Sequence, residues 1–223
     1  MSLLAQIEPL ADLEKAKDMA AYHKAPRVYL GVANPKLDEV VKAYQAAHPV
    51  ADWVVEARAL WDTDVFEARI LAGKLLTKAR LREKEGEVWQ TLAQWVPSFD
   101  SWAIADHASG AASRRLVADP VRLDTVEAWA RADGLWQRRA ALVMTLPWAK
   151  LSHPNAADLE RRERILGWAA DLTRDKAWFA QKAVGWWLRT LAKKDPARVR
   201  AFVEAHGAEM KAFAVREALK PLG

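Results

Sequence analysis

The sequence of 223 residues contains no cysteine. This absence excludes disulfide scaffolds, thiolate metal sites and a cysteine nucleophile together. No apolar stretch approaches the ~18 residues that a membrane-spanning helix needs. At the N-terminus, Met1 to Glu8 carries no basic residue, and Glu8 and Pro9 interrupt the apolar run, so no secretory signal is visible. We therefore expect a soluble, cytoplasmic protein.

Several common functional motifs are also missing. The sequence has no GxxxxGK[ST], no GxGxxG, no HExxH and no GxSxG pattern. The five histidines show no spacing typical of metal ligands: His23, His48, His107, His153 and His206. We therefore expect no metal ion and no cofactor.

Glycine and proline are scarce, with nine and ten residues, and they fall between segments of helical apolar periodicity. Alanine, leucine, arginine, lysine and glutamate fill those segments, and alternating β-branched residues are rare. This pattern predicts an all-α protein without strands. Asp195, directly before Pro196, is expected to cap the start of a late helix.

The helical segments contain an internal repeat. An aromatic residue heads each of four similar segments, at steps of 36, 34 and 43 residues: Phe66, Trp102, Trp136 and Phe179. In three of them a basic residue follows three positions later: Arg69, Arg139 and Lys182. This spacing favours a single domain, residues 1–223, of stacked two-helix HEAT-like units with a basic concave face. A four-helix bundle with extra helices is the alternative, but it does not readily explain the recurring basic residue.

The charge balance favours polyanionic partners. Lysine and arginine number 34 against 29 aspartate and glutamate, which gives a net charge of +5. Tryptophan is unusually frequent, with 12 residues. We interpret eight of them as packing residues of helix pairs: Trp53, Trp61, Trp89, Trp95, Trp129, Trp148, Trp168 and Trp178.

The segment from Ser98 to His107 is a candidate site. Trp102 and Asp106 are four residues apart, so on a helix they share one face. A carboxylate repels phosphate, and on a basic DNA-facing surface it would be expected only where it meets a cation. The structural alternative is that Asp106 caps a helix or pairs with Arg114 or Arg115.

The sequence resembles the AlkD-like DNA alkylation repair proteins, HEAT-like-repeat glycosylases that remove positively charged alkylpurines. Seven short segments carry the resemblance in order: Ala21-Tyr22-His23-Lys24, Tyr29-Leu30-Gly31-Val32, Leu60-Trp61, Phe66-Glu67-Ala68-Arg69, Trp102-Ala103-Ile104-Ala105-Asp106, Leu135-Trp136-Gln137-Arg138-Arg139 and Gln181-Lys182-Ala183-Val184-Gly185-Trp186. They run from about Tyr22 to the last helices. Each segment alone is weakly specific, and their common order is more specific.

The resemblance implies a role for five residues. Asp106 matches the catalytic aspartate of the family. Trp102 and Trp186 match two tryptophans that cradle the backbone of the lesion nucleotide, and Tyr22 matches a third aromatic residue at the lesion. Arg139 matches a basic residue that holds a nearby phosphate.

Two features depart from the family pattern. His107 follows the aspartate where a small hydroxyl residue is expected, and the Trp186-Trp187 doublet leaves two candidates for the second tryptophan. The family also contains relatives that bind DNA without excising bases. A non-catalytic DNA-structure-binding protein and a protein-binding helical scaffold therefore remain as alternatives.

A lone carboxylate suits cationic substrates. A purine alkylated at N3 or N7 carries a positive charge and leaves without protonation, so the enzyme needs no general acid. It needs a group that stabilises the oxocarbenium-like sugar and positions a water molecule, and one carboxylate supplies both. We therefore expect a monofunctional glycosylase with water as its nucleophile, acting as a monomer on alkylated double-stranded DNA. The phosphate-binding candidates are Arg69, Arg138, Lys182 and Lys193.

Overall fold

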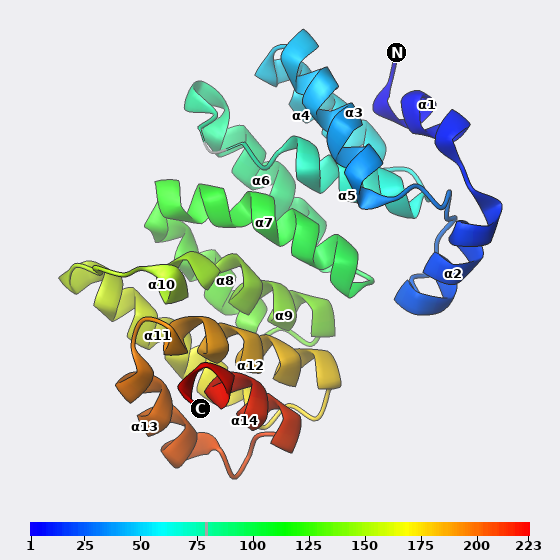
Figure 1. Cartoon of the computed structure of the whole chain (residues 1–223). Helices are drawn as coiled ribbons and strands as arrows, with labels where there is room; N and C mark the ends of the chain where they lie inside the picture. The colour runs from blue at the N-terminus through cyan, green and yellow to red at the C-terminus, as the bar shows by residue number, and fades with distance from the viewer. Residues whose placement is uncertain (79) are drawn as a thin grey trace. The chain divides into compact units, whose positions relative to one another are not determined.

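The computed structural model describes residues 1–78 and 80–223. These residues are mostly helical (Figure 1), and an isolated bridge between Val28 and Val65 is the only β-pairing among them. The predicted all-α fold is confirmed. None of the described helices is long and apolar enough to cross a membrane. The chain forms two compact units, Met1–Ala118 and Asp119–Gly223.

The first unit consists of helix pairs. Its helices are α1 (Leu3–Ile7), α2 (Leu13–His23), α3 (Asn34–Ala47), α4 (Val50–Trp61), α5 (Phe66–Leu75), α6 (Glu85–Trp95) and α7 (Trp102–Ala118). Helix α4 packs on α5 and α6 packs on α7, while α3, α5 and α7 pack side by side (Figure 1). Each pair therefore buries the apolar face of its neighbour, as in a helical repeat.

The second unit repeats this arrangement. Its helices are α8 (Leu123–Ala130), α9 (Leu135–Met144), α10 (Leu146–Lys150), α11 (Ala156–Leu172), α12 (Trp178–Ala192), α13 (Pro196–His206) and α14 (Ala212–Leu219). Helix α8 packs on α9, α11 on α12 and α13 on α14, and α12 lies between α9 and α14. Asp195 caps α13 by accepting a hydrogen bond from the Arg198 amide, as the sequence predicts.

The four aromatic repeat residues stand at equivalent places. Phe66 and Trp102 are the first residues of α5 and α7, and Trp136 and Phe179 are the second residues of α9 and α12. Each therefore begins the second helix of a pair, which confirms the HEAT-like repeat.

Glycine allows the inner helices to approach closely. A Cβ atom on Gly73 of α5 would lie 2.9 Å from the His107 carbonyl carbon of α7, closer than real Cβ atoms come. Gly185 of α12 has a similar place, because its Cβ would lie 3.1 Å from the Ala214 carbonyl oxygen of α14. Backbone contact at Gly73 fixes the position of α7 along α5, and therefore also the position of the segment that begins at Trp102.

Candidate active site

Three helix ends meet in the first unit: the C-terminus of α2 and the N-termini of α5 and α7. The segment after α2 pairs with the segment before α5, since the Val28 amide donates to the Asp64 carbonyl at 3.0 Å and the Phe66 amide to the Val28 carbonyl at 2.8 Å. Arg27 adds ion pairs to Asp64 at 3.0 Å and to Asp100, just before α7, at 2.6 Å. A guanidinium that bridges two carboxylates ties all three segments together.

A buried carboxylate fixes the same loop from the inside. Glu67 of α5 is fully buried and accepts hydrogen bonds from the amides of Leu30 at 3.0 Å, Gly31 at 2.7 Å and Val32 at 3.2 Å. Three amide donors compensate the lost hydration of one carboxylate. This contact holds the Tyr29–Val32 segment against the Phe66–Arg69 segment.

The converging ends form an aromatic cluster. The His23 ring lies 4.9 Å from Tyr22, 4.7 Å from Phe66 and 5.0 Å from Trp102, measured between ring centroids. Tyr22 also meets Trp102 edge to face at 5.9 Å, and 70% of Tyr22 is exposed. Burial among these aromatic faces lowers the pKa of His23. The cluster thus brings Tyr22 and Trp102, two of the predicted site residues, together in one unit.

Asp106 lies one helical turn after Trp102 and opens onto a pocket of about 330 Å³. The pocket is also lined by Lys74 of α5 and Asp38 of α3, which form an ion pair at 2.5 Å. Asp106 stands in the interior of α7, so the alternative that it caps a helix is wrong. The guanidinium of Arg115 donates a hydrogen bond to the Lys78 carbonyl at 2.7 Å and forms an ion pair with Glu85 at 2.7 Å.

His107 lines the same pocket and departs from its usual acid–base behaviour. Burial, with a smaller contribution from the charge of Lys74, lowers its pKa from 6.5 to about 4. His107 is therefore neutral at physiological pH, and it adds no charge beside Asp106.

The low pKa of His107 predicts a pH-dependent stability. The unfolded chain binds a proton below pH 6.5 while the folded chain does not until about pH 4. As the pH is lowered from 6.5 to about 4, the free energy of unfolding should therefore decrease, by up to about 3 kcal/mol from this group. Denaturant titrations at pH 7.5 and pH 4 should show a larger loss for the wild type than for His107→Gln. Equal losses would contradict the assigned pKa.

The second unit separates the two residues of the tryptophan doublet. Trp187 is fully buried in α12, whereas Trp186 is half-buried and lines two pockets. Trp186 is therefore the member of the pair that a ligand can reach. Arg139 of α9 is only 3% exposed, and its guanidinium lies 5.9 Å from the Trp186 ring and 5.7 Å from the Phe179 ring. In this unit Arg139 stabilises the position of Trp186.

The four predicted phosphate-binding residues differ in what their cations contact. Arg69 donates to the Ser98 carbonyl at 3.3 Å and lies over Trp61, while Arg138 pairs with Asp175 at 2.8 Å and donates to the Ala132 carbonyl. Lys182 and Lys193 are exposed and line pockets. The two lysines are thus open to solvent, whereas both arginines contact other groups of the protein.

Sequence reasoning missed several residues at these sites. Lys74 and Asp38 lie beside Asp106, and Lys150 and Lys220 line the pocket that Lys193 also lines. Lys74 comes two helical turns after Phe66, and this spacing is a signal that could have identified it. Lys150 and Lys220 stand outside the repeat motif, so no sequence pattern connects them with Lys193.

Comparison with known proteins gives one family. The family model described as DNA alkylation repair enzyme matches residues 3–222, across both units. A predicted DNA alkylation repair enzyme from Enterococcus faecalis has a similar structure, with 22% sequence identity, a TM-score of 0.77 and coverage of 96% of this chain and 97% of that one. AlkD2 from Streptococcus mutans has 18% identity and a TM-score of 0.60 over 85% of this chain and 88% of that one. A search among curated proteins finds no match.

Proposed function

Since the chain belongs to the DNA alkylation repair enzyme family, we propose that it hydrolyses the N-glycosidic bond of cationic N3- or N7-alkylated purines in duplex DNA. One observation carries the proposal: Asp106 is half-buried at a pocket, one turn after Trp102. A mid-helix carboxylate of this kind has no capping role and faces a space that substrate can enter.

The proposed reaction needs only this carboxylate and water. As the bond to the cationic base stretches, positive charge develops on the sugar, and the Asp106 carboxylate stabilises it electrostatically. The same oxygens accept a proton from the attacking water as it adds to the anomeric carbon, and the neutral base departs with the bonding electrons. Neutral lesions would be poor substrates, because His107 is deprotonated at neutral pH and supplies no proton.

We further propose that residues 1–223 act as one domain on one duplex. The first unit carries Asp106, Trp102 and Tyr22, and the second unit carries exposed lysines beside Trp186. The phosphate contact of Arg139 and the basic concave face stay predictions.

Lys193 gives a direct test of phosphate binding. Lys193→Ala should weaken duplex binding at low salt and lower the slope of log affinity against log salt by about one, because one fewer counterion is released. Fluorescence anisotropy with a labelled duplex at roughly 50 to 200 mM salt measures this slope. Lys42→Ala, on the exposed surface of α3, is the matched control and should leave the slope unchanged. An unchanged slope for Lys193→Ala would mean that this lysine does not contact a DNA phosphate.

The activity itself is tested by single-turnover release of N7-methylguanine from methylated duplex DNA. We expect free base and an intact abasic strand, because no strand cleavage accompanies hydrolysis by water. Tight duplex binding without release would favour the non-catalytic DNA-binding alternative. Neither release nor binding would favour the protein-binding scaffold.

A further inference from the structure

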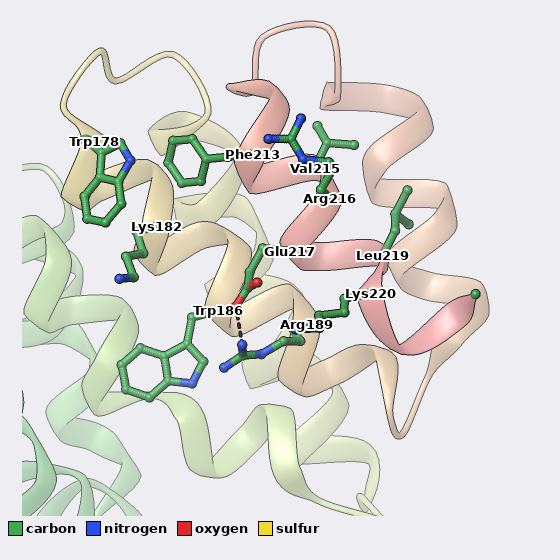
Figure 2. A pocket seen from close by; sticks show the side chains of 11 residues that line it. Trp178, Lys182, Trp186, Arg189, Phe213, Val215, Arg216, Glu217, Leu219 and Lys220 are labelled. Atoms are coloured by element: carbon green, nitrogen blue, oxygen red, sulfur yellow. Dashed lines mark hydrogen bonds and ion pairs between the residues drawn. The ribbon is translucent and has the colours of Figure 1, made fainter.

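Two pockets of the second unit join into one groove. A pocket of about 950 Å³ extends over α12 and α14, and a second of about 560 Å³ reaches Lys150 of α10. Both are lined by Trp186, Arg189 and Lys220, so they are continuous. We call them together the C-terminal groove; Figure 2 shows the larger pocket.

Aromatic side chains line one end of this groove. Trp178, predicted to be a packing residue, packs against two aromatic rings, but 48% of it remains exposed. Its ring lies 5.4 Å from that of Phe213, with 30° between the planes (Figure 2). It also meets the Phe179 ring in a T-shaped contact, with 4.8 Å between the ring centroids. A large aromatic ring that is fixed by two neighbours and still open to solvent is suited to stacking on a planar ligand.

Cations dominate the rest of the groove. Its second pocket is lined by Lys150, Arg189, Lys193, Lys194 and Lys220, and Lys182 and Arg216 line the aromatic end. Among the lining residues that the structure describes, Glu217 has the one acidic side chain, and it is paired with Arg189. The charge of the groove therefore complements an extended polyanion.

We propose that the C-terminal groove binds a single strand of nucleic acid, with an unpaired base stacked on Trp178 and the phosphates along the lysines. Bases inside a duplex are covered by their neighbours and cannot stack on a protein ring, so the ligand is single-stranded. The ammonium of Lys182 lies 4.5 Å from the centre of the Trp178 ring. An incoming base displaces the flexible, exposed ammonium group of Lys182, which then contacts the phosphate of the same nucleotide.

Two features favour nucleic acid over an acidic peptide. An acidic peptide would use the lysines but has no repeating planar groups for the exposed face of Trp178. The aromatic end and the lysine end also share Trp186 and Lys220, so one ligand can present a planar group to the first and anionic groups to the second, as a nucleotide strand does. The groove shares Trp186, Lys182 and Lys193 with the surface proposed above for the duplex, so a single strand and a duplex would occupy it in turn. Single-strand binding requires neither an alkylated base nor Asp106, so it goes beyond the proposed glycosylase.

The test compares two oligonucleotides with the same phosphates. A fluorescein-labelled ten-nucleotide thymidine strand and a matching strand of abasic tetrahydrofuran units are titrated with the full chain, and anisotropy reports affinity. The wild type should bind the thymidine strand more tightly. Trp178→Ala should lower that affinity about 10-fold, and Trp178→Phe should lose less, since each base–aromatic stack contributes about 1–3 kcal/mol. The abasic strand should bind Trp178→Ala and wild type alike.

A second variant separates the phosphate contact from stacking. Lys182→Ala should weaken both strands by a similar factor, because both carry the phosphate that this lysine meets. Equal affinity of the wild type for the two strands would overturn the proposal, since the groove would then recognise only the charge of the phosphates. Equal loss of both strands in Trp178→Ala would overturn it as well.

Discussion

Asp106→Asn is expected to slow the single-turnover release of N7-methylguanine from duplex DNA about 100- to 1,000-fold, the range seen when one group that stabilises developing charge is removed. Asparagine keeps the shape of the side chain but loses the negative charge that stabilises the sugar cation. The affinity for intact duplex should stay the same or rise, because one charge that repels phosphate is lost. Base release under enzyme excess and anisotropy with the same duplex measure the two effects separately.

Asp38→Asn is the matched control for this experiment. Asp38 lines the same pocket as Asp106, but its side chain is 63% exposed and paired with Lys74. Its loss should change the release rate by no more than about twofold, because solvent screens the charge of this mostly exposed carboxylate. Full activity in Asp106→Asn, or an equal loss in both variants, would contradict the assignment of Asp106 as the catalytic carboxylate.

The helical repeat could be predicted from the sequence because its signals are local. Phe66, Trp102, Trp136 and Phe179 recur at nearly regular steps, and each begins the second helix of a pair. The Asp195-Pro196 cap was equally predictable, since capping depends on residues three apart. The division into two units could not be predicted from the composition, because Ala118 ends an ordinary helix and Asp119 lies in the short loop that follows.

The candidate site was predictable only in part. Helical periodicity places Trp102 and Asp106 on one face, but it says nothing about Lys74 or Asp38, which reach the pocket from other helices. The exposure of individual side chains could not be predicted from the sequence either. Trp187 is fully buried, while its neighbour Trp186 lines a groove. Adjacent helical residues point about 100° apart, and only the packing of α12 decides which one faces outward.

Gly31→Ala should give the largest loss of stability, about 4 kcal/mol. Gly31 has a φ of +80°, which costs an L side chain about 1–2 kcal/mol. A Cβ there would also lie 2.1 Å from the Asp12 carbonyl oxygen and 2.7 Å from the Ala16 amide nitrogen. These are backbone atoms of α2 and its cap, which cannot rotate away, so the loop must shift at an added cost of about 1–3 kcal/mol. Urea denaturation followed by circular dichroism measures the loss.

The loop shift should also reach the candidate active site. The Gly31 amide donates to Glu67, and the Leu30 carbonyl accepts from the Asp12 amide at 2.8 Å, so this loop positions α2 and the Tyr22 ring at its end. Gly31→Ala should therefore slow base release at temperatures where the variant is still folded. Gly110→Ala is the matched stability control in the same unit: its Cβ would meet nothing within 4 Å, so alanine should stabilise α7 by about 0.5–1 kcal/mol. Unchanged stability in Gly31→Ala would mean that the loop does not pack against α2 as the structure describes.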